Sequence, residues 1–383
     1  MRSSPTVLSD ELMSTATGLL TIDLAAVRAN WRTVCQHLSE RPAAVLKADA
    51  YGLGAEPVGN SLYRAGCREF FFATLEEALA ARSYLPEDTH LYILGGVRPG
   101  EESECLNAGL VPVLYSLAAI DRWAKVCQQA DTKAPSVIKV DTGMTRLGLS
   151  LYDWEQLRAA PDRLRACHPS VVMSHLACAD EWGHPMNREQ QRRFAVIAVQ
   201  ARALLPGVRC SLANSSGIFL GRDWHFDMAR PGASLYGFDP HLGREPRMHP
   251  VVQLALPVLQ WRELRSEAAV GYGATTKVPA GRQLAIVAGG YADGLNRTIG
   301  RVGGQGYLGE TRVPVVGRIS MDTTIFDVTD AMLTSPAESA WIQVLDHRLT
   351  VAEVSHRIDA LGYEVLTSLA GRYRRVYRDE VAK

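Results

Sequence analysis

The chain lacks several features that mark whole classes of protein. Its 383 residues carry 41 Lys plus Arg and 41 Asp plus Glu, so no surplus charge is available to attract nucleic acid or an anionic membrane. No apolar run reaches membrane-spanning length, and the N-terminus lacks the basic-then-apolar pattern of a secretory signal. The seven cysteines are scattered without a CxxC pair, which argues against a disulfide framework and a thiolate zinc site. We therefore expect a cytoplasmic protein with no nucleic-acid or membrane partner and no metal.

The sequence does contain an alternation of short apolar runs and amphipathic segments between about residues 40 and 235. Such alternation is typical of parallel βα units, and eight strands are the number that closes a (β/α)8 barrel. A doubly wound sheet is the competing architecture, but no GxGxxG fingerprint follows the first run. We favour the barrel, with expected strands at 43–47, 69–73, 91–94, 111–114, 137–140, 171–175, 209–212 and 226–230.

The pattern changes after Asp239. Helical periodicity largely disappears until about 350–361, and short strand-like runs are separated by glycines, which predicts a β-domain. A polar stretch with prolines at 238–250 marks the boundary, and the N-terminal residues, rich in Ser and Thr, look like a loose tail. We predict an α/β protein with a loose tail over 1–17, a (β/α)8 barrel over 18–240 and a C-terminal mostly-β domain over 241–383.

The most informative segment is AAVLKADAYGLGA, residues 43–55. Its apolar run predicts a buried strand, and its glycines predict a tight turn directly afterwards. Lys47 then lies at the carboxyl end of the strand, where desolvation lowers the pKa of an amine and makes it nucleophilic. A lysine whose amine merely reaches solvent from a strand end is the alternative, and this segment alone leaves both open.

Further polar residues stand at the ends of later strands. They are Lys139 with Asp141 and the following Arg146, His175, and Arg230. Each alone has a structural explanation, such as a salt bridge or a buried histidine. Because the carboxyl ends of barrel strands meet at the face that carries the active site, their recurrence there predicts a site.

The loops after the seventh and eighth strands suggest an anion site. NSSGIFL reads as a helix N-terminus capped by Asn214 or Ser215, where free backbone amides favour an anion. Gly232 and Ala233 follow the eighth strand, and barrel proteins often hold phosphate between these two loops. A helix cap without a ligand is the alternative.

The β-domain holds two motifs of interest. VGYGATTKV places Tyr272 in a glycine-flanked turn, and VGRISMDTTIFDV places Met321 at the end of a strand-like run. Aromatic residues in turns usually serve packing, so these motifs alone indicate little.

Taken together, the motifs resemble the alanine racemase family. AVLKADAYGLGA, KVDTGMTRLG, SHLACAD, ANSSG, ARPGASLYG, GYGAT, GYADGLNR and GRISMD occur in the order and spacing of that family, from about residue 18 to the C-terminus. The resemblance implies a homodimer in which a pyridoxal-phosphate barrel is fused to a β-domain, with each active site completed by the β-domain of the partner. It also implies racemisation of L-alanine and D-alanine, supplying D-alanine for peptidoglycan.

The resemblance further implies a role for each matching residue. Lys47 corresponds to the lysine that carries the cofactor, and Tyr272 to the opposing base. The resemblance implies phosphate contacts for Tyr51, Ser215, Gly232 and Ala233, and cofactor binding for Asn214 and His175. Arg230 corresponds to the partner of the ring nitrogen, and His175 to the group that links Arg230 towards Tyr272. Arg146 and Met321 correspond to contacts of the substrate carboxylate, and Lys139 to a lysine that is carbamylated in many members and braces Arg146.

These residue types suit the chemistry. Racemisation removes a proton from one face of Cα and returns one to the other, so two bases must face each other. Free lysine and tyrosine side chains have pKa values near 10, so both need nearby positive charge or desolvation to act near neutrality. An arginine at the ring nitrogen, always charged, should limit electron withdrawal into the ring and suppress transamination.

Two positions depart from the family pattern. Leu53 replaces a common histidine, and Gly371 stands where part of the family has a tyrosine that narrows the entrance, so substrate strictness is open. The alternatives are a racemase of broader or different choice (serine or lysine), a catabolic alanine racemase, a single-barrel pyridoxal-binding homeostasis protein, and a related decarboxylase. The β-domain argues against the homeostasis protein, which is a single barrel. The decarboxylase would need a C-terminal site with Cys and Asp, and no such motif is found.

Overall fold

The structure, a computed structural model, describes residues 17–241, 243–244, 247–331, 340–369 and 371–379. The chain divides into two compact units. One is Ala26–His249, and the other joins Pro250–Lys383 to the N-terminal residues up to Ala25. Apart from residue 17, the predicted tail over 1–17 lies outside the described residues.

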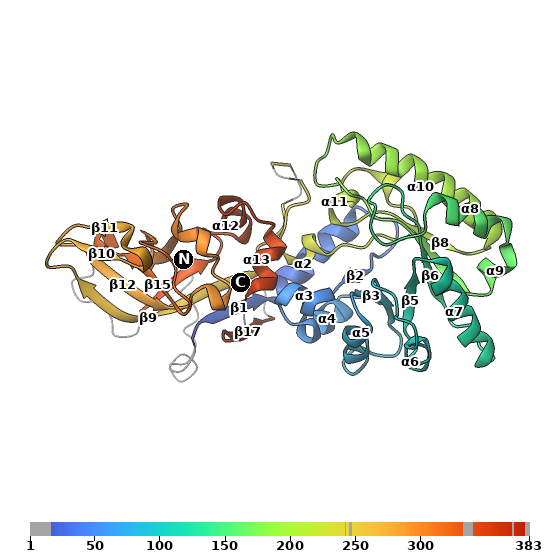
Figure 1. Cartoon of the computed structure of the whole chain (residues 1–383), viewed down its shortest axis with the longest axis horizontal. Helices are drawn as coiled ribbons and strands as arrows, with labels where there is room; N and C mark the ends of the chain where they lie inside the picture. Colours follow the sequence, from blue (N-terminus) through green and yellow to red (C-terminus); the bar gives the residue numbers. More distant parts are fainter. Residues whose placement is uncertain (1–16, 242, 245–246, 332–339, 370, 380–383) are drawn as a thin grey trace. The chain divides into compact units, whose positions relative to one another are not determined.

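The unit Ala26–His249 is built on a parallel sheet whose strands pair in sequence order (Figure 1). VPVL at 111–114 is buried at every position, as expected for a strand covered on both faces. The strands are β2 (Ala44–Val45), β3 (Glu69–Phe72), β4 (His90–Ile93), β5 (Val111–Leu114), β6 (Ser136–Lys139), β7 (Pro169–Met173) and β8 (Arg209–Ser211).

The eighth predicted strand, 226–230, is an extended segment rather than a regular strand. On one side the amide of Arg230 donates to the carbonyl of Ala213, and on the other the amide of Val45 donates to the carbonyl of Pro231, both at 2.9 Å. Phe226 at the start of the segment has φ 52°, which is not an extended conformation, and the segment makes only isolated bridges to its β8-side neighbour. Two backbone hydrogen bonds on each side nevertheless join the segment to β2 and to β8 with the residues after it, and so close the barrel.

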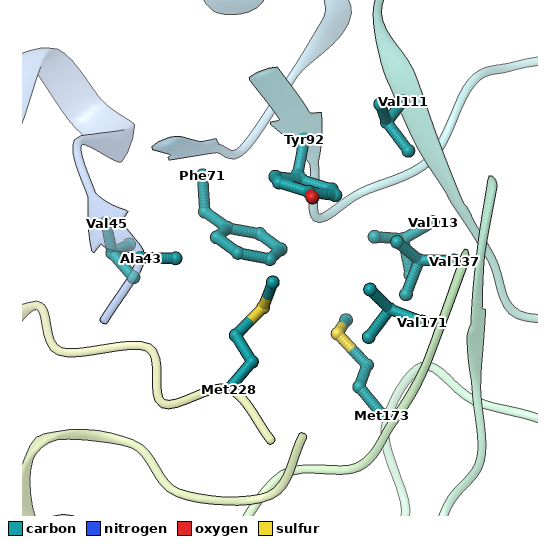
Figure 2. Packing of buried hydrophobic residues seen from close by; sticks show 10 residues of the cluster. All are labelled: Ala43, Val45, Phe71, Tyr92, Val111, Val113, Val137, Val171, Met173 and Met228. Carbon is teal, nitrogen blue, oxygen red and sulfur yellow. The ribbon is translucent and has the colours of Figure 1, made fainter. Parts of the chain in front are cut away.

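The interior of the barrel is a cluster of buried apolar side chains (Figure 2). Strands β2 to β7 contribute to it, and Met228 of the closing segment packs into the same cluster. The ring of Phe71 stacks on that of Tyr92, with centroids 4.4 Å apart. The side chains that fill the barrel therefore come from all sides of it, as in a packed (β/α)8 core.

Helices follow most of the barrel strands. In the helix at 117–129, Ser116 caps the N-terminus by accepting from the amide of Ala119, and Ile120, Trp123 and Cys127 form its buried face. No helix in the described ranges is both long and apolar enough to cross a lipid bilayer. The helices are α2 (Leu24–Gln36), α3 (Lys47–Gly52), α4 (Ala55–Arg64), α5 (Leu75–Arg82), α6 (Glu102–Asn107), α7 (Leu117–Gln129), α8 (Leu151–Ala159), α9 (Pro161–Arg165), α10 (Pro185–Leu204) and α11 (Ser215–Ile218), with 3-10 turns η1 (Arg222–Trp224) and η2 (Ala233–Tyr236).

The other unit is mostly β. A mainly antiparallel sheet has the strand order β14-β13-β16-β9-β1-β17, and β12 joins β9 to β15. Its elements are β1 (Leu19–Asp23), β9 (Val252–Glu263), β10 (Ala268–Val270), β11 (Thr276–Val278), β12 (Gln283–Ala288), β13 (Gln305–Leu308), β14 (Thr311–Pro314), β15 (Thr323–Asp327), β16 (Trp341–Leu345), β17 (Arg374–Arg378), α12 (Val351–Arg357), α13 (Gly362–Ser368) and the 3-10 turns η3 (Tyr272–Ala274), η4 (Tyr291–Asp293), η5 (Arg297–Gly300) and η6 (Thr329–Ala331). The predicted fold class, a (β/α)8 barrel with a C-terminal mostly-β domain, is confirmed.

The placement of β1 differs from the predicted domain boundary at residue 18. Leu19–Asp23 pairs antiparallel with β9 and parallel with β17, so it belongs to the β-unit and not to the barrel. Its first four residues are all buried, which fits a central strand covered on both faces. The unit is therefore assembled from both ends of the chain, and its second boundary, at Pro250, lies within the polar stretch 238–250.

Candidate active site

The barrel residues predicted to form a site lie at the carboxyl ends of its strands. Lys47 follows β2, Lys139 ends β6, His175 follows β7, Ser215 follows β8, and Arg230 lies in the closing segment. Because the strands are parallel, these positions share one face of the barrel. Desolvation, and then the charges of Arg230, Lys139, Arg146 and Lys47, hold the pKa of the half-buried His175 well below its usual range. The structure therefore brings the side chains of Lys47, Lys139, Arg146, His175 and Arg230 together.

The turn directly after Lys47 is left-handed. Ala48, Asp49, Ala50 and Tyr51 all have φ between 52° and 59°. Left-handed backbone costs a non-glycine residue about 1–2 kcal/mol, so the run stores on the order of 4–8 kcal/mol. Hydrogen bonds hold it: the amide of Ala50 donates to Leu46 O at 2.7 Å, and the amide of Ala48 donates to the Glu77 carboxylate at 2.8 Å. The backbone next to the lysine is thus fixed in a conformation that it would not adopt alone.

Burial makes both lysines of the site easier to deprotonate. Desolvation, and then the charge of Arg146, lowers the pKa of Lys47. Lys139 is 7% exposed, and desolvation followed by the charges of Arg230 and Arg146 lowers its pKa to about 8. Arg146 itself is exposed, in a loop that Asp141 shapes by accepting from two backbone amides.

Arg230 is a buried cation with uncharged hydrogen-bond partners. Its guanidinium is 4% exposed and donates to Ser211 Oγ, to the Ser174 carbonyl at 2.6 Å and to the Leu212 carbonyl at 3.4 Å. Burial lowers its pKa to about 10, so the group stays charged near neutral pH. A buried charge solvated by neutral oxygens is costly, and it favours an acceptor atom or an anion beside it.

The loops after β8 and the closing segment form a cradle. Asn214 caps α11 by accepting from the amide of Gly217, and Ser215 Oγ accepts from the amide of Gly232 at 3.0 Å. A Cβ at Gly232 would lie 2.5 Å from the hydroxyl of Tyr51, so only glycine fits there. Ala233 begins η2 directly afterwards. The predicted phosphate residues of the barrel are therefore adjacent to one another.

One positioning residue was not predicted from the sequence. Gln190, fully buried on α10, donates to His175 O at 2.9 Å and to Thr142 Oγ1 at 3.3 Å, and accepts from the amide of Ala177 at 2.8 Å. It thereby ties the loop after β6 to the loop after β7. A glutamine in a polar, amphipathic segment gives no sequence signal for this role.

The β-unit carries the other two predicted residues. Tyr272, in η3, is 67% exposed and Met321 is 51% exposed. Arg372 was not predicted, and its guanidinium pairs with Asp293 at 2.7 Å and with Asp322 at 2.8 Å. It ties the turn that contains η4 to the turn beside Met321, so it shapes the predicted substrate-contact segment.

Comparison with known families decides what this arrangement is. The sequence profile described as "Alanine racemase, N-terminal domain" matches residues 22–240, and the profile "Alanine racemase, C-terminal domain" matches residues 251–377. The chain belongs to the alanine racemase family. The resemblance inferred from the motifs is therefore confirmed.

Individual members of the alanine racemase family match nearly the whole chain. An alanine racemase of Rhodospirillum rubrum is 48% identical over 366 residues, covering 94% of this chain and 96% of that protein. A catabolic alanine racemase of Rhizobium johnstonii is 40% identical over 364 residues, covering 95% of each. The crystal structure of the Bartonella henselae alanine racemase with covalently bound pyridoxal phosphate has a TM-score of 0.89 and 38% identity, covering 95% of this chain and all of that one.

The residues of the barrel suit the family's cofactor. Pyridoxal 5'-phosphate combines an aldehyde, a phosphate and a ring nitrogen. Lys47 offers an amine, Ser215 offers a hydroxyl that accepts from the Gly232 and Ser234 amides and can itself donate, and Arg230 offers a buried donor. The two departures from the family pattern lie in different settings. Leu53 is fully buried, so its replacement of a histidine concerns packing. Gly371 is exposed, and a Cβ added to it would meet no atom of the described residues within 4 Å.

Proposed function

We propose that this chain interconverts L-alanine and D-alanine with pyridoxal 5'-phosphate as its cofactor. The observation that carries the proposal is the desolvated Lys47, placed by a strained turn among Lys139, Arg146 and Arg230 at the carboxyl face of the barrel. Such a cationic cluster suits a cofactor with a phosphate and a substrate with a carboxylate. The free cysteines, most of them buried, support a place in the reducing cytoplasm, and supply of D-alanine for peptidoglycan is the proposed role.

The cofactor would be held at three points. Lys47 would carry it, Tyr51, Asn214, Ser215, Gly232 and Ala233 would bind the phosphate, and Arg230 would face the ring nitrogen. When bound, pyridoxal 5'-phosphate supplies an electron sink for the negative charge that develops at Cα of the amino acid. Because the guanidinium of Arg230 stays charged, it leaves the ring nitrogen as an acceptor and limits that withdrawal, which disfavours transamination.

The proposed proton transfers use two side chains. On one face the neutral amine of Lys47 would take the Cα proton and its ammonium form would return it. On the other face the phenolate oxygen of Tyr272 would take the proton and its hydroxyl would return it. The lowered pKa of Lys47 increases its neutral fraction near neutral pH, so it can act as a base. Arg146 and Met321 bind the substrate carboxylate, with Lys139 bracing Arg146.

We propose that the active enzyme is a homodimer with shared sites. Tyr272 and Met321 are both more than half exposed in the single chain, which leaves them free to complete the site of another copy. Mixing Lys47→Ala protein with Tyr272→Phe protein should restore partial activity after subunit exchange, because one site of the mixed dimer has both bases. Exchange without recovery of activity contradicts a shared site.

The cofactor attachment gives the direct test of the proposed function. Borohydride reduction of the purified protein, followed by peptide mapping, should find the cofactor on the Lys47 peptide, and the protein should racemise alanine. Lys139 is the internal control, because it is the other lysine of the same site and is itself buried. Cofactor on Lys139, or on no lysine, would overturn the assignment.

A second candidate function is racemisation of larger amino acids such as serine or lysine. The glycine at 371 supports it, because part of the family narrows the entrance with a tyrosine at that position and a Cβ at Gly371 would meet no atom of the described residues within 4 Å. A racemisation assay across a panel of amino acids separates the two, and a strict preference for alanine excludes the broader activity.

A further inference from the structure

Glu77 joins the ends of two neighbouring barrel strands. One carboxylate oxygen accepts from the amide of Ala48 at 2.8 Å, and the other accepts from the amide of Ala73 at 2.7 Å. Ala48 is the residue after Lys47, and Ala73 is the residue after β3. A single carboxylate therefore fixes the peptide group next to the lysine and ties it to the adjacent strand. Hydrogen bonds to a charged acceptor are stronger than neutral ones, and both distances are short.

Glu77 does not make the hydrogen bond that its position on the helix predicts. Thr74 caps α5 by accepting from the amide of Glu77 at 3.2 Å, which places Glu77 at the third helical position. A glutamate there ordinarily reaches back to the amide of the capping residue and completes a capping box. Here it reaches past Thr74 to Ala73 and across to Ala48. Capping of α5 therefore does not account for the contact with the turn after Lys47.

Glu77 is also a negative charge beside Lys47. Lys139 at the end of β6, Arg146 in the following loop and the half-buried His175 lie on the same face of the barrel, and the two cations oppose protonation of Lys47. The Glu77 carboxylate acts in the opposite sense and raises the pKa of Lys47, although by less than desolvation and Arg146 each lower it. The residue thus acts on both the backbone and the charge of the site.

We propose that Glu77 is a positioning residue, whose bidentate carboxylate holds the left-handed turn at Ala48–Tyr51 and so fixes Lys47 in the active site. The proposal rests on the proposed role of Lys47, but the turn itself can be observed without it. Glu77→Gln is the sharpest variant, because it keeps the size of the side chain and places an amide donor against a backbone donor. Glu77→Asp keeps the charge and shortens the reach. Glu76→Gln is the matched control, one residue away on the exposed side of the same helix.

The test measures amide hydrogen exchange of the 48–55 segment in the cofactor-loaded protein. Loss of a charge-assisted hydrogen bond should accelerate exchange in this segment on the order of 10- to 100-fold in Glu77→Gln, with the other barrel strands unchanged. Glu77→Asp should accelerate it as well, and Glu76→Gln should leave it at the parent value. Unchanged exchange in both Glu77 variants overturns the proposal, as does equal acceleration throughout the barrel, which indicates a merely structural role.

A second readout uses the amine of Lys47 in protein stripped of cofactor. The pH dependence of its acylation by a small amine reagent, followed on the Lys47 peptide, should move to lower pH in Glu77→Gln and stay nearer the parent in Glu77→Asp. An unmoved profile in Glu77→Gln removes the charge part of the proposal. Racemase assays give a third readout. In the Glu77 variants kcat should fall by a larger factor than KM changes, and a loss of kcat/KM that comes only from a raised KM counts against positioning. If the parent protein shows no racemase activity, the proposed function fails while hydrogen exchange still tests Glu77.

Discussion

Replacing Lys139 by methionine should stabilise the cofactor-free protein near neutral pH. Burial and two neighbouring guanidinium groups lower the pKa of Lys139 from 10.5 to about 8. At about 1.4 kcal/mol per pH unit, the charged amine costs the folded state about 3 kcal/mol relative to the unfolded chain. Because the folded-state pKa is the lower one, this cost is fully present below pH 8, fades as the pH rises towards 10.5 and is absent above it. Methionine has a similar volume and no charge, so it removes the cost.

Urea unfolding measures the difference. In buffer depleted of carbon dioxide, Lys139→Met should exceed the parent in free energy of unfolding by up to about 3 kcal/mol near pH 7, and by clearly less near pH 10. Bicarbonate should stabilise the parent but not the variant, because a carbamate on the neutral amine would turn the unfavourable cation into an anion beside Arg230 and Arg146. A variant less stable than the parent near neutral pH, or a difference independent of pH, would refute the electrostatic reasoning.

Three further predictions follow from the described geometry. Gly232→Ala should weaken cofactor affinity about 10- to 100-fold in a cofactor titration, because overpacking against Tyr51 costs about 1–3 kcal/mol. Gly183→Ala is the control and should have no effect, because its added Cβ would meet no described atom within 4 Å. If both variants bind the cofactor equally well, Gly232 is not part of a phosphate cradle. Tyr272→Phe should reduce exchange of the Cα proton of L-alanine on the order of 10² to 10⁴-fold and retain some exchange with D-alanine, and equal losses in deuterium wash-in from heavy water would show that the tyrosine is not a face-specific base. Gly371→Tyr should lower kcat/KM for serine relative to alanine in a racemisation assay, and an unchanged ratio means that this position does not set specificity.

The barrel strands could be predicted because parallel strands covered on both faces are continuous apolar runs. EFFFA and VPVL contain no competing pattern, and their observed bounds agree with the prediction within a residue or two. The segment at 226–230 was predicted as an ordinary strand, yet Phe226 has φ 52°, and irregularly spaced backbone hydrogen bonds close the barrel. An apolar run therefore indicates position in the barrel, but not the regularity of pairing.

Other features left little trace in the sequence. β1 was assigned to the barrel because it precedes it, and only pairing with β17, at the other end of the chain, shows where it belongs. The left-handed turn after Lys47 contains Ala48 and Ala50, residues that normally avoid this conformation, so no local preference announces it. Glu77 looks like any helix-terminal acid. Such features arise from contacts between distant segments, which motif spacing does not encode.

The pairing of β1 with β17 has a consequence for how the protein is made. The barrel, Ala26–His249, is one uninterrupted stretch, so it can fold as soon as that stretch has left the ribosome. β1 is synthesised earlier, but its neighbours β9 and β17 come later, and at about 5–20 residues per second it waits on the order of tens of seconds for the last of them. Until β9 has been made, both edges of this apolar strand are unpaired, and the edge that pairs with β17 stays open until the end of synthesis, which exposes the strand to association with other chains. Chaperone dependence and aggregation of nascent chains should therefore be governed by residues 19–23 more than by any part of the barrel.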